Sequence, residues 1–203
     1  EADKYLKQYV GSAEFINDIQ RFCVWVPDAE LASAKQVGPI ATRLDAVAEW
    51  RRGREEVGVR AFAEFPNRFK QVAYKATESI IVPRVSSARR EYVPIGYLGE
   101  NAVISDAANA VYDAEPWIFT LLTSKIHMAW LAAVGGRMKT DYRYGAYIVY
   151  NNFPVPQMSE TLKEKLTVAA LRVLDVREYH CEQTLAELYD PDRMPQDLRD
   201  AHA

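Results

Sequence analysis

The stretch that most constrains the fold begins at the double glycine Gly135-Gly136 and runs to Tyr144. Two adjacent glycines permit a tight turn or a close approach of the backbone. Charged and aromatic residues then alternate, and a period of two predicts an extended strand with two different faces. A row of hydrogen-bonding side chains on such a ribbon can read base edges in the major groove of DNA, although the pattern alone favours a solvated face with no binding role. The charged face would carry Arg137, Lys139, Asp141 and Arg143.

Length and composition bound the class of protein. The 203 residues fit one sizeable domain, or one domain with an appendage, and a hydrophobic content of 49% is ample for a core. A net charge of -3 argues against a broadly basic nucleic-acid coat but leaves room for a local basic patch. The only cysteines, Cys23 and Cys181, lie far apart, so we expect no disulfide framework and a reducing cytoplasm.

Targeting and membrane signals are not found in the sequence. No apolar run approaches the roughly 20 residues of a membrane span, so we expect no membrane partner, and no signal peptide is recognisable. The chain begins at Glu1 without a methionine, and we therefore interpret it as an excised fragment of a longer protein.

The pattern of apolar residues, prolines and glycines predicts an α+β fold, with a mixed sheet and packed helices over residues 1–157 and a helical segment over 158–203. The strongly apolar predicted helix, 116–134, should turn one apolar face from Ile118 to Val134 towards the core and end at the double glycine. Ser159 should cap the helix that follows Pro156. The expected strands are 21–26 (buried), 79–83, 92–98 and 102–105, the expected helices are 39–54, 116–134, 159–188 and 196–201, and a loop with aromatic anchors covers 61–69.

Catalytic signatures are missing. There is no glycine-rich cofactor loop and there are no paired cysteines at metal spacing, so we predict no catalytic, cofactor-binding or metal-binding residues. His127 stands alone on a predicted helix, where a structural role is favoured over a catalytic one. Asn151-Asn152-Phe153-Pro154 superficially resembles the Asn-Pro-Pro-aromatic motif of DNA amino-methylating enzymes, but no proline follows either asparagine, and a turn is the better interpretation.

Several long runs together resemble a known family. The runs 83–94, 122–130, 136–144 and 150–154 look like the target-recognition domain of MmeI-like enzymes, which are single-chain type II restriction-modification proteins. The tail 185–190, with Met194-Pro195 and Leu198, resembles the helical C-terminal segment of the same family. The resemblance covers essentially the whole chain.

In that family one polypeptide holds a nuclease, an S-adenosylmethionine-dependent adenine-N6 methyltransferase and a recognition domain, and this chain resembles only the last. The resemblance therefore implies sequence-specific recognition of double-stranded DNA, which positions the target for catalysis elsewhere in the parent chain. It also implies that S-adenosylmethionine, and magnesium for cleavage, belong to the parent enzyme, whose methyltransferase and nuclease domains would be the partners of this segment.

The resemblance further suggests base-reading residues, in three pairs. Arginine or lysine donates to guanine O6 and N7, and aspartate accepts from cytosine N4, so a cation beside a carboxylate suits a G·C pair. The alternative for each pair is an ordinary surface salt bridge that contributes about 0–1 kcal/mol. We expect Arg84 and Asp106 to lie close together, because each directly follows a predicted strand. The pairs are Lys139 with Asp141, Arg84 with Asp106 and, with weaker chemistry, Ala107 with Arg143.

A second set of residues suits the DNA backbone, because hydroxyls and arginines commonly bind phosphate oxygens. The candidates are Ser86, Ser87, Arg89, Arg90 and Arg137. The cluster Arg51, Arg52 and Arg54 fits either phosphate binding or a solvated helix end.

Two other functions remain open. The fragment could itself be an enzyme, which the missing cofactor loop disfavours, or a protein–protein docking module that uses its C-terminal helices, which the net negative charge mildly favours.

Overall fold

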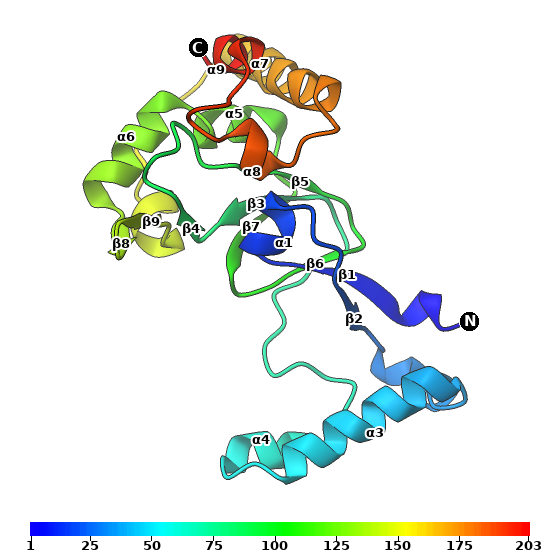
Figure 1. Ribbon diagram of the computed structural model, residues 1–203. Coiled ribbons are helices and arrows are strands. Elements are labelled where there is room, and N and C mark those ends of the chain that lie inside the picture. Colours follow the sequence, from blue (N-terminus) through cyan, green and yellow to red (C-terminus); the bar gives the residue numbers. More distant parts are fainter. The chain divides into compact units, whose positions relative to one another are not determined.

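A computed structural model describes all residues, Glu1–Ala203, and the chain divides into two compact units. The first unit comprises residues 1–9 and 21–74, and the second comprises 10–20 and 75–203 (Figure 1). Both helices and short strands are present, so the prediction of an α+β fold is confirmed. The predicted boundary near 157 stays a prediction. The helical tail lies in the same compact unit as residues 75–157.

In the first unit, β1 (Leu6–Val10) pairs antiparallel with β2 (Phe22–Val24). The helix predicted over 39–54 is α3 (Gly38–Arg52), with a proline in its first turn, where the missing N–H costs nothing. Its buried side chains recur every four residues and pack against Tyr5 and Val26. The remaining elements are η1 (Asp3–Tyr5), η2 (Asp28–Glu30), α2 (Leu31–Ala34), α4 (Val57–Ala61) and η3 (Phe62–Glu64).

The strand expected to be buried over 21–26 is only three residues long, and Phe22 is 59% exposed. This expectation was therefore wrong in burial. Because β2 is an edge strand, it lacks a neighbour on one side and stays partly in solvent.

In the second unit, β3 (Ser79–Pro83) is the central strand of an antiparallel sheet, between β5 (Gly96–Leu98) and β7 (Ala108–Tyr112). Every residue of β3 is buried, which explains its unbroken apolar sequence. The expected strand 92–98 is extended as a strand only from Gly96, and the expected strand 102–105 corresponds to β6 (Ala102–Ile104). Sequence reasoning missed β7, which begins with small residues.

The charged stretch after the double glycine is a hairpin and not one strand. It consists of β8 (Gly136–Met138) and β9 (Asp141–Arg143), and β9 also pairs with β4 (Val85–Ser86) (Figure 1). Lys139 turns the chain with a left-handed φ of 57°. Because Arg137 lies opposite Tyr142 and Met138 opposite Asp141, the predicted single charged face does not exist.

After β9 the chain forms a π-helical turn, η4 (Ala146–Tyr150).

The single helix predicted over 116–134 is two helices, α5 (Pro116–Leu122) and α6 (Lys125–Val134), with a bend of 54° between them. The hydroxyl of Thr123 donates to the Phe119 carbonyl, and the hydroxyl of Ser124 accepts from the N–H of His127. Ser124 therefore starts a new helix as its N-cap. The bend also breaks the predicted apolar face, and Ile126 is 73% exposed.

No single helix is long and apolar enough to cross a membrane; α5 and α6 meet the length and hydropathy criteria only as a bent pair.

The C-terminal tail forms α7 (Glu160–Tyr179), α8 (Leu185–Leu188) and α9 (Gln196–His202). Ser159 caps α7 as predicted, but the helix ends about nine residues before the expected Leu188. Figure 1 shows α7 beside α9, and α7 also packs on α5. The core of the second unit thus includes the tail, through Ala170, Val173 and Leu198.

The buried polar side chains of this unit include His127 and Arg177. His127 is fully buried, and its Nε2 is 2.8 Å from the hydroxyl of Tyr144, an environment that suits the structural role predicted for this histidine. Arg177 donates through Nε to the hydroxyl of Tyr189 at 2.8 Å and through Nη1 to the carbonyl of Ile95. Arg177 therefore fastens α7 to the segment that leads into β5.

Candidate nucleic-acid interface

Arg84 occupies the single residue between two sheets of the second unit. Pro83 ends β3, where it pairs with Ala108 of β7, and Val85 begins β4, where it pairs with Arg143 of β9. The main chain of Arg84 is held from both sides, because its N–H donates to the Ala107 carbonyl at 3.3 Å and its carbonyl accepts from the N–H of Tyr144 at 2.8 Å. The position of Arg84 is therefore set by backbone hydrogen bonds from two directions.

The structure brings Arg84 and Asp106 together as predicted, although the strands that they follow, β3 and β6, belong to different sheets and it is β7 that pairs with β3. Nη1 of Arg84 donates to the main-chain carbonyl of Asp106 at 2.7 Å. This contact uses the backbone of Asp106, so it is not the carboxylate salt bridge that we considered as the alternative. The carboxylate of Asp106 lies on an exposed residue, where it can accept a hydrogen bond from a ligand.

The third suggested pair lies around the same residue. The carbonyl of Ala107 accepts from the N–H of Arg84. Arg143 pairs across the sheet with Val85, which directly follows Arg84 in the chain. Both Ala107 and Arg143 are exposed. Arg84, Asp106, Ala107 and Arg143 therefore form one local group, which we call the Arg84 junction.

Lys139 and Asp141 lie at the tip of the β8–β9 hairpin, on either side of Thr140. Lys139 is exposed, and Oδ1 of Asp141 accepts from the N–H of Ala88 at 3.4 Å. The hairpin tip is thereby connected to the turn at 87–90. Because side chains two residues apart on a strand share a face, Asp141 and Arg143 point to the same side of β9.

The two serines proposed as phosphate ligands differ in accessibility. Ser86 is only 4% exposed, and its hydroxyl is buried without a partner, so it is out of reach of a phosphate on the surface. The hydroxyl of Ser87 accepts from the N–H of Arg89 at 3.3 Å and shapes the turn.

The three arginines proposed as phosphate ligands have different surroundings. Arg89 forms an exposed ion pair with Asp192 at 2.7 Å. Arg90 is half-buried, and burial lowers its pKa while the carboxylates of Asp190 and Asp141 oppose that shift. Arg137 stacks on the ring of Tyr142, with its guanidinium 4.0 Å from the ring centre. Arg89 and Arg137 remain exposed enough to reach an external anion.

The basic cluster at the end of α3 is partly structural. Arg51 donates to the carbonyls of Phe62, Phe65 and Arg68 at 3.0, 2.7 and 2.8 Å, and so it holds the loop with aromatic anchors. Arg54 stacks on exposed Trp50, 3.9 Å from the ring centre. Arg51 is thus neither a solvated helix end nor a free phosphate ligand.

Comparison with known families decides the class of this chain. The family described as "MmeI, target recognition domain" matches residues 1–157, and the family "MmeI, C-terminal domain" matches residues 158–203. The chain belongs to the MmeI target recognition domain family. The family resemblance inferred from the sequence runs is therefore confirmed.

Two relatives of this target recognition domain are informative. The chain is 40% identical over 200 residues to DNA methyltransferase A of Bacillus subtilis (strain 168), covering 98% of this chain and 22% of that protein. Its fold is similar to the type IIL restriction-modification enzyme MmeI in complex with DNA, with a TM-score of 0.92 and 35% identity over 99% of this chain and 27% of that one. The chain thus spans about a quarter of the length of each relative.

Sequence reasoning missed one residue of the target recognition domain that touches the Arg84 junction. Ser12, at the start of α1 (Ser12–Ile16), accepts through its hydroxyl from the N–H of Arg84 at 3.2 Å and donates to the carbonyl of Ala107. No motif signals this contact, because it joins three segments that are distant in the chain.

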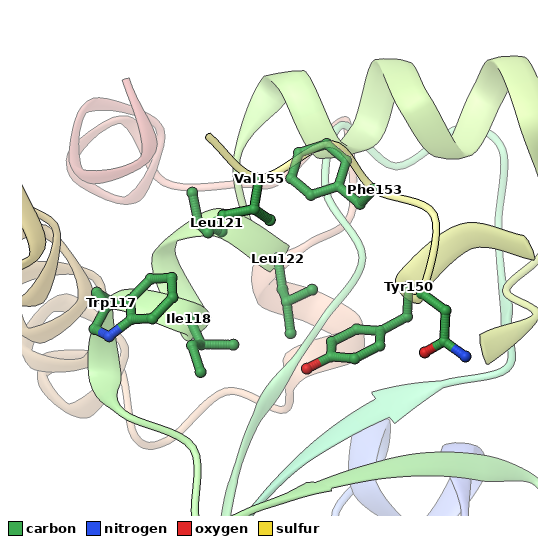
Figure 2. A pocket seen from close by; sticks show the side chains of 8 residues that line it. Trp117, Ile118, Leu121, Leu122, Tyr150, Phe153 and Val155 are labelled. Carbon is green, nitrogen blue, oxygen red and sulfur yellow. The ribbon is translucent and has the colours of Figure 1, made fainter. Parts of the chain in front are cut away.

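A cavity of about 390 Å³ lies elsewhere in the second unit, between α5 and the segment that follows η4. Figure 2 shows Trp117 and Ile118 of α5 on one side of the cavity and the ring of Tyr150 across from them, with Leu122 between. The remaining lining residues are Leu121, Asn151, Phe153 and Val155. With aliphatic and aromatic walls and no charged side chain, the cavity does not belong to the Arg84 junction.

Proposed function

We propose that this chain is the sequence-specific duplex-DNA recognition module of a DNA adenine-N6 methyltransferase with restriction activity. In this proposal it positions the target for catalytic domains that lie elsewhere in a longer polypeptide. The observation that carries the proposal is the Arg84 junction, because a guanidinium and a carboxylate-bearing residue meet there on a backbone held by two sheets. Family membership and the similarity to MmeI in complex with DNA support it.

The chemistry of the junction suits a G·C pair. Arg84 uses one N–H on the Asp106 carbonyl, and the other donors of a guanidinium can serve guanine O6 and N7. The exposed carboxylate of Asp106 can accept from the N4 amino group of cytosine. Tethering to Asp106 also restricts the guanidinium before DNA arrives, which lowers the entropy lost on binding.

The hairpin provides a second reading position, at a distance that fits the spacing of base pairs in a duplex. Asp141 and Arg143 share one face of β9 and lie two residues apart, about 7 Å at the rise of a strand. Successive base pairs are about 3.4 Å apart, so this spacing corresponds to about two base-pair steps. The pair Lys139 and Asp141 would therefore read a base pair near the one at the Arg84 junction.

Phosphate contacts would set the register of the module on the duplex. Arg89 and Arg137 are the candidates, since both are exposed; Arg89 projects from the turn at 87–90 and Arg137 from β8, beside the reading residues. Each is now held by a weak surface contact, Arg89 by Asp192 and Arg137 by Tyr142, that a phosphate could replace.

The cofactors belong, in this proposal, to the rest of the polypeptide. S-adenosylmethionine would be bound by the methyltransferase domain and magnesium by the nuclease domain. The methyltransferase domain would also extrude the adenine from the stack, because methylation at N6 requires the base outside the duplex. A protein with this role works where the genome is, in the bacterial cytoplasm.

A second function, docking onto another protein domain, has one observation in its favour. The outward face of α7 exposes large apolar side chains, with Val168 at 67% and Tyr179 at 79% exposure. A docking surface can coexist with DNA reading, because the candidate readers lie on short strands and loops and not on α7. Salt dependence separates the two, since phosphate contacts make affinity fall steeply with salt whereas apolar docking does not.

Selection from a random pool of DNA tests the proposal. The chain is incubated at low salt with duplexes carrying a randomised central segment, and bound molecules are amplified and sequenced over several rounds. We expect one recurrent motif that contains at least two fixed G·C pairs. A bound pool with the composition of the input would contradict sequence-specific recognition.

A further inference from the structure

Ser12 links the two sides of the Arg84 junction through a single hydroxyl. Its Oγ accepts from the N–H of Arg84 at 3.2 Å and donates to the carbonyl of Ala107. The N–H of Arg84 also donates directly to that carbonyl at 3.3 Å, so the two acceptors share one proton. The Ser12 hydroxyl therefore closes a small ring with the backbones of both predicted reading segments.

The start of α1 is packed tightly onto the loop at 105–107. The carbonyl of Val10 accepts from the N–H of Ser105 at 2.8 Å. A Cβ added at Gly11 would lie 2.6 Å from Oγ of Ser105 and 3.2 Å from Cβ of Ala107, so only glycine fits there without a shift. Ser12 is consequently presented to the junction from a backbone that has little freedom to move.

Removal of the hydroxyl would leave the junction with less restraint. The N–H of Arg84 would keep only its long hydrogen bond to the carbonyl of Ala107, and that carbonyl would lose the hydrogen bond from the Ser12 hydroxyl. The loop at 105–107 also supplies the Asp106 carbonyl that holds the guanidinium. A shift of this loop would therefore move the guanidinium of Arg84 and the carboxylate of Asp106 together.

We propose that Ser12 is a positioning residue for base discrimination: without reaching DNA itself, its hydroxyl fixes the spacing between Arg84 and the 105–107 loop that reads the same base pair. This inference rests on the proposed function of the chain as a DNA-recognition module. It differs from a role in folding because its effect is confined to one base pair. Readout at the hairpin tip, by Lys139 and Asp141, does not depend on Ser12.

The chain offers a matched control in Ser124. Its hydroxyl accepts from the N–H of His127 at 3.1 Å and donates to the carbonyl of Leu121 at 2.7 Å. Ser12 and Ser124 thus each make one hydrogen bond to a backbone N–H and one to a backbone carbonyl in the same compact unit. Ser124→Ala removes equivalent contacts at the α5–α6 break, away from the Arg84 junction.

The experiment measures the ratio of dissociation constants between the selected duplex and duplexes altered at one base pair. The base pair at which Arg84→Ala loses discrimination defines the Arg84 position, and another fixed position serves as the internal reference. We expect Ser12→Ala to lower the ratio at the Arg84 position about tenfold and to change the reference position less than about twofold. We expect Ser12→Thr, which keeps the hydroxyl, to retain both ratios, and Ser124→Ala to lower thermal stability with both ratios unchanged.

Two results overturn the inference while the proposed function stands. One is a Ser12→Ala chain that discriminates like the wild type at the Arg84 position; the other is an equal loss at every position, which would mean that the hydroxyl only supports the fold. Should Ser12→Ala fail to fold, Ser12→Cys gives the same comparison, because a thiol of similar size is a weak hydrogen-bonding group. A wild-type chain that binds all duplexes equally overturns the proposed function and this inference together.

Discussion

The N–H of Tyr144 donates a 2.8 Å hydrogen bond to the carbonyl oxygen of Arg84, and the hydroxyl of the same tyrosine lies 2.8 Å from Nε2 of His127 in the core. One residue therefore connects the predicted reader to a fully buried histidine on α6. Because protein interiors are close-packed and deform little, this connection holds the backbone of Arg84 in a fixed position. The functional surface is thus held by the core of the second unit, although the candidate readers are on short strands and loops.

Replacement of Arg84 tests direct readout. We expect Arg84→Ala to cost about 1–3 kcal/mol of discrimination at a single base pair, because a guanidinium that donates to guanine O6 and N7 is lost. Arg84→Lys should retain part of the affinity but less of the discrimination, since an ammonium lacks the planar fork. Competition binding with singly substituted duplexes measures both quantities. A uniform loss across all duplexes would identify Arg84 as a phosphate ligand instead.

Replacement of Arg89 tests a phosphate contact. Arg89→Ala should weaken binding to every duplex alike and reduce the slope of log affinity against log salt by about 1. Asp192→Asn should act in the opposite direction, because it frees Arg89 from its ion pair at 2.7 Å. Neither change should alter folding stability much, since exposed ion pairs contribute about 0–1 kcal/mol. An unchanged salt slope in Arg89→Ala would exclude this contact.

The buried histidine gives a prediction for pH. Burial lowers the pKa of His127 to about 4, whereas an unfolded histidine has a pKa of about 6.5. Between these values the unfolded chain binds a proton that the folded chain does not, so the free energy of unfolding falls as the pH falls. From pH 7 to 5.5, wild type should lose about 1 kcal/mol more than His127→Phe in urea denaturation. Parallel losses in the two proteins would show that His127 does not titrate in this way.

Two glycines that flank the β8–β9 hairpin should respond differently to substitution. A Cβ at Gly135 would lie 2.5 Å from the carbonyl oxygen of Leu131 and 2.7 Å from its Cδ1, whereas a Cβ at Gly145 meets nothing within 4 Å. We expect Gly135→Ala to destabilise the chain by about 1–3 kcal/mol and Gly145→Ala to stay within about 0.5 kcal/mol of wild type. Thermal unfolding of the two variants side by side makes the comparison. Equal midpoints would contradict the crowding at Gly135.

Patterns that depend on local chemistry were predictable from the sequence. The apolar run of β3 reflects the burial of that strand, and the serine before α7 caps the first turn of its own helix. Each signal depends on one element alone. The double glycine marked the end of α6 for the same reason. The proximity of Arg84 and Asp106 was predicted, but for a different reason from the one in the structure. Asp106 follows β6, which is not in the sheet of β3, and the antiparallel pairing of β3 with β7, a strand that the sequence did not indicate, brings the two residues to the same edge.

Other features could not be inferred because two structures share one pattern. A hairpin with a two-residue turn has the same alternating sequence as a continuous strand, and a continuous strand would place Arg137 and Asp141 on one face. In the structure the chain reverses at Lys139, and the two side chains lie on different faces. An apolar helical period likewise continues across Thr123 and Ser124, where hydroxyls that bond the backbone separate α5 from α6. The contact of Ser12 with Arg84 depends on tertiary structure and leaves no local signal.

The central claim is that this chain carries sequence recognition, and an exchange of segments tests it most directly. The chain replaces the matching segment of the Bacillus subtilis DNA methyltransferase A, to which it is 40% identical over 200 residues, and methylated positions are then mapped in DNA exposed to the chimaera. Reinsertion of the original segment through the same junctions controls for damage by the exchange. We predict that methylation moves to sites containing the motif selected by the isolated chain; methylation that stays at the sites of the unmodified Bacillus subtilis enzyme would contradict the account.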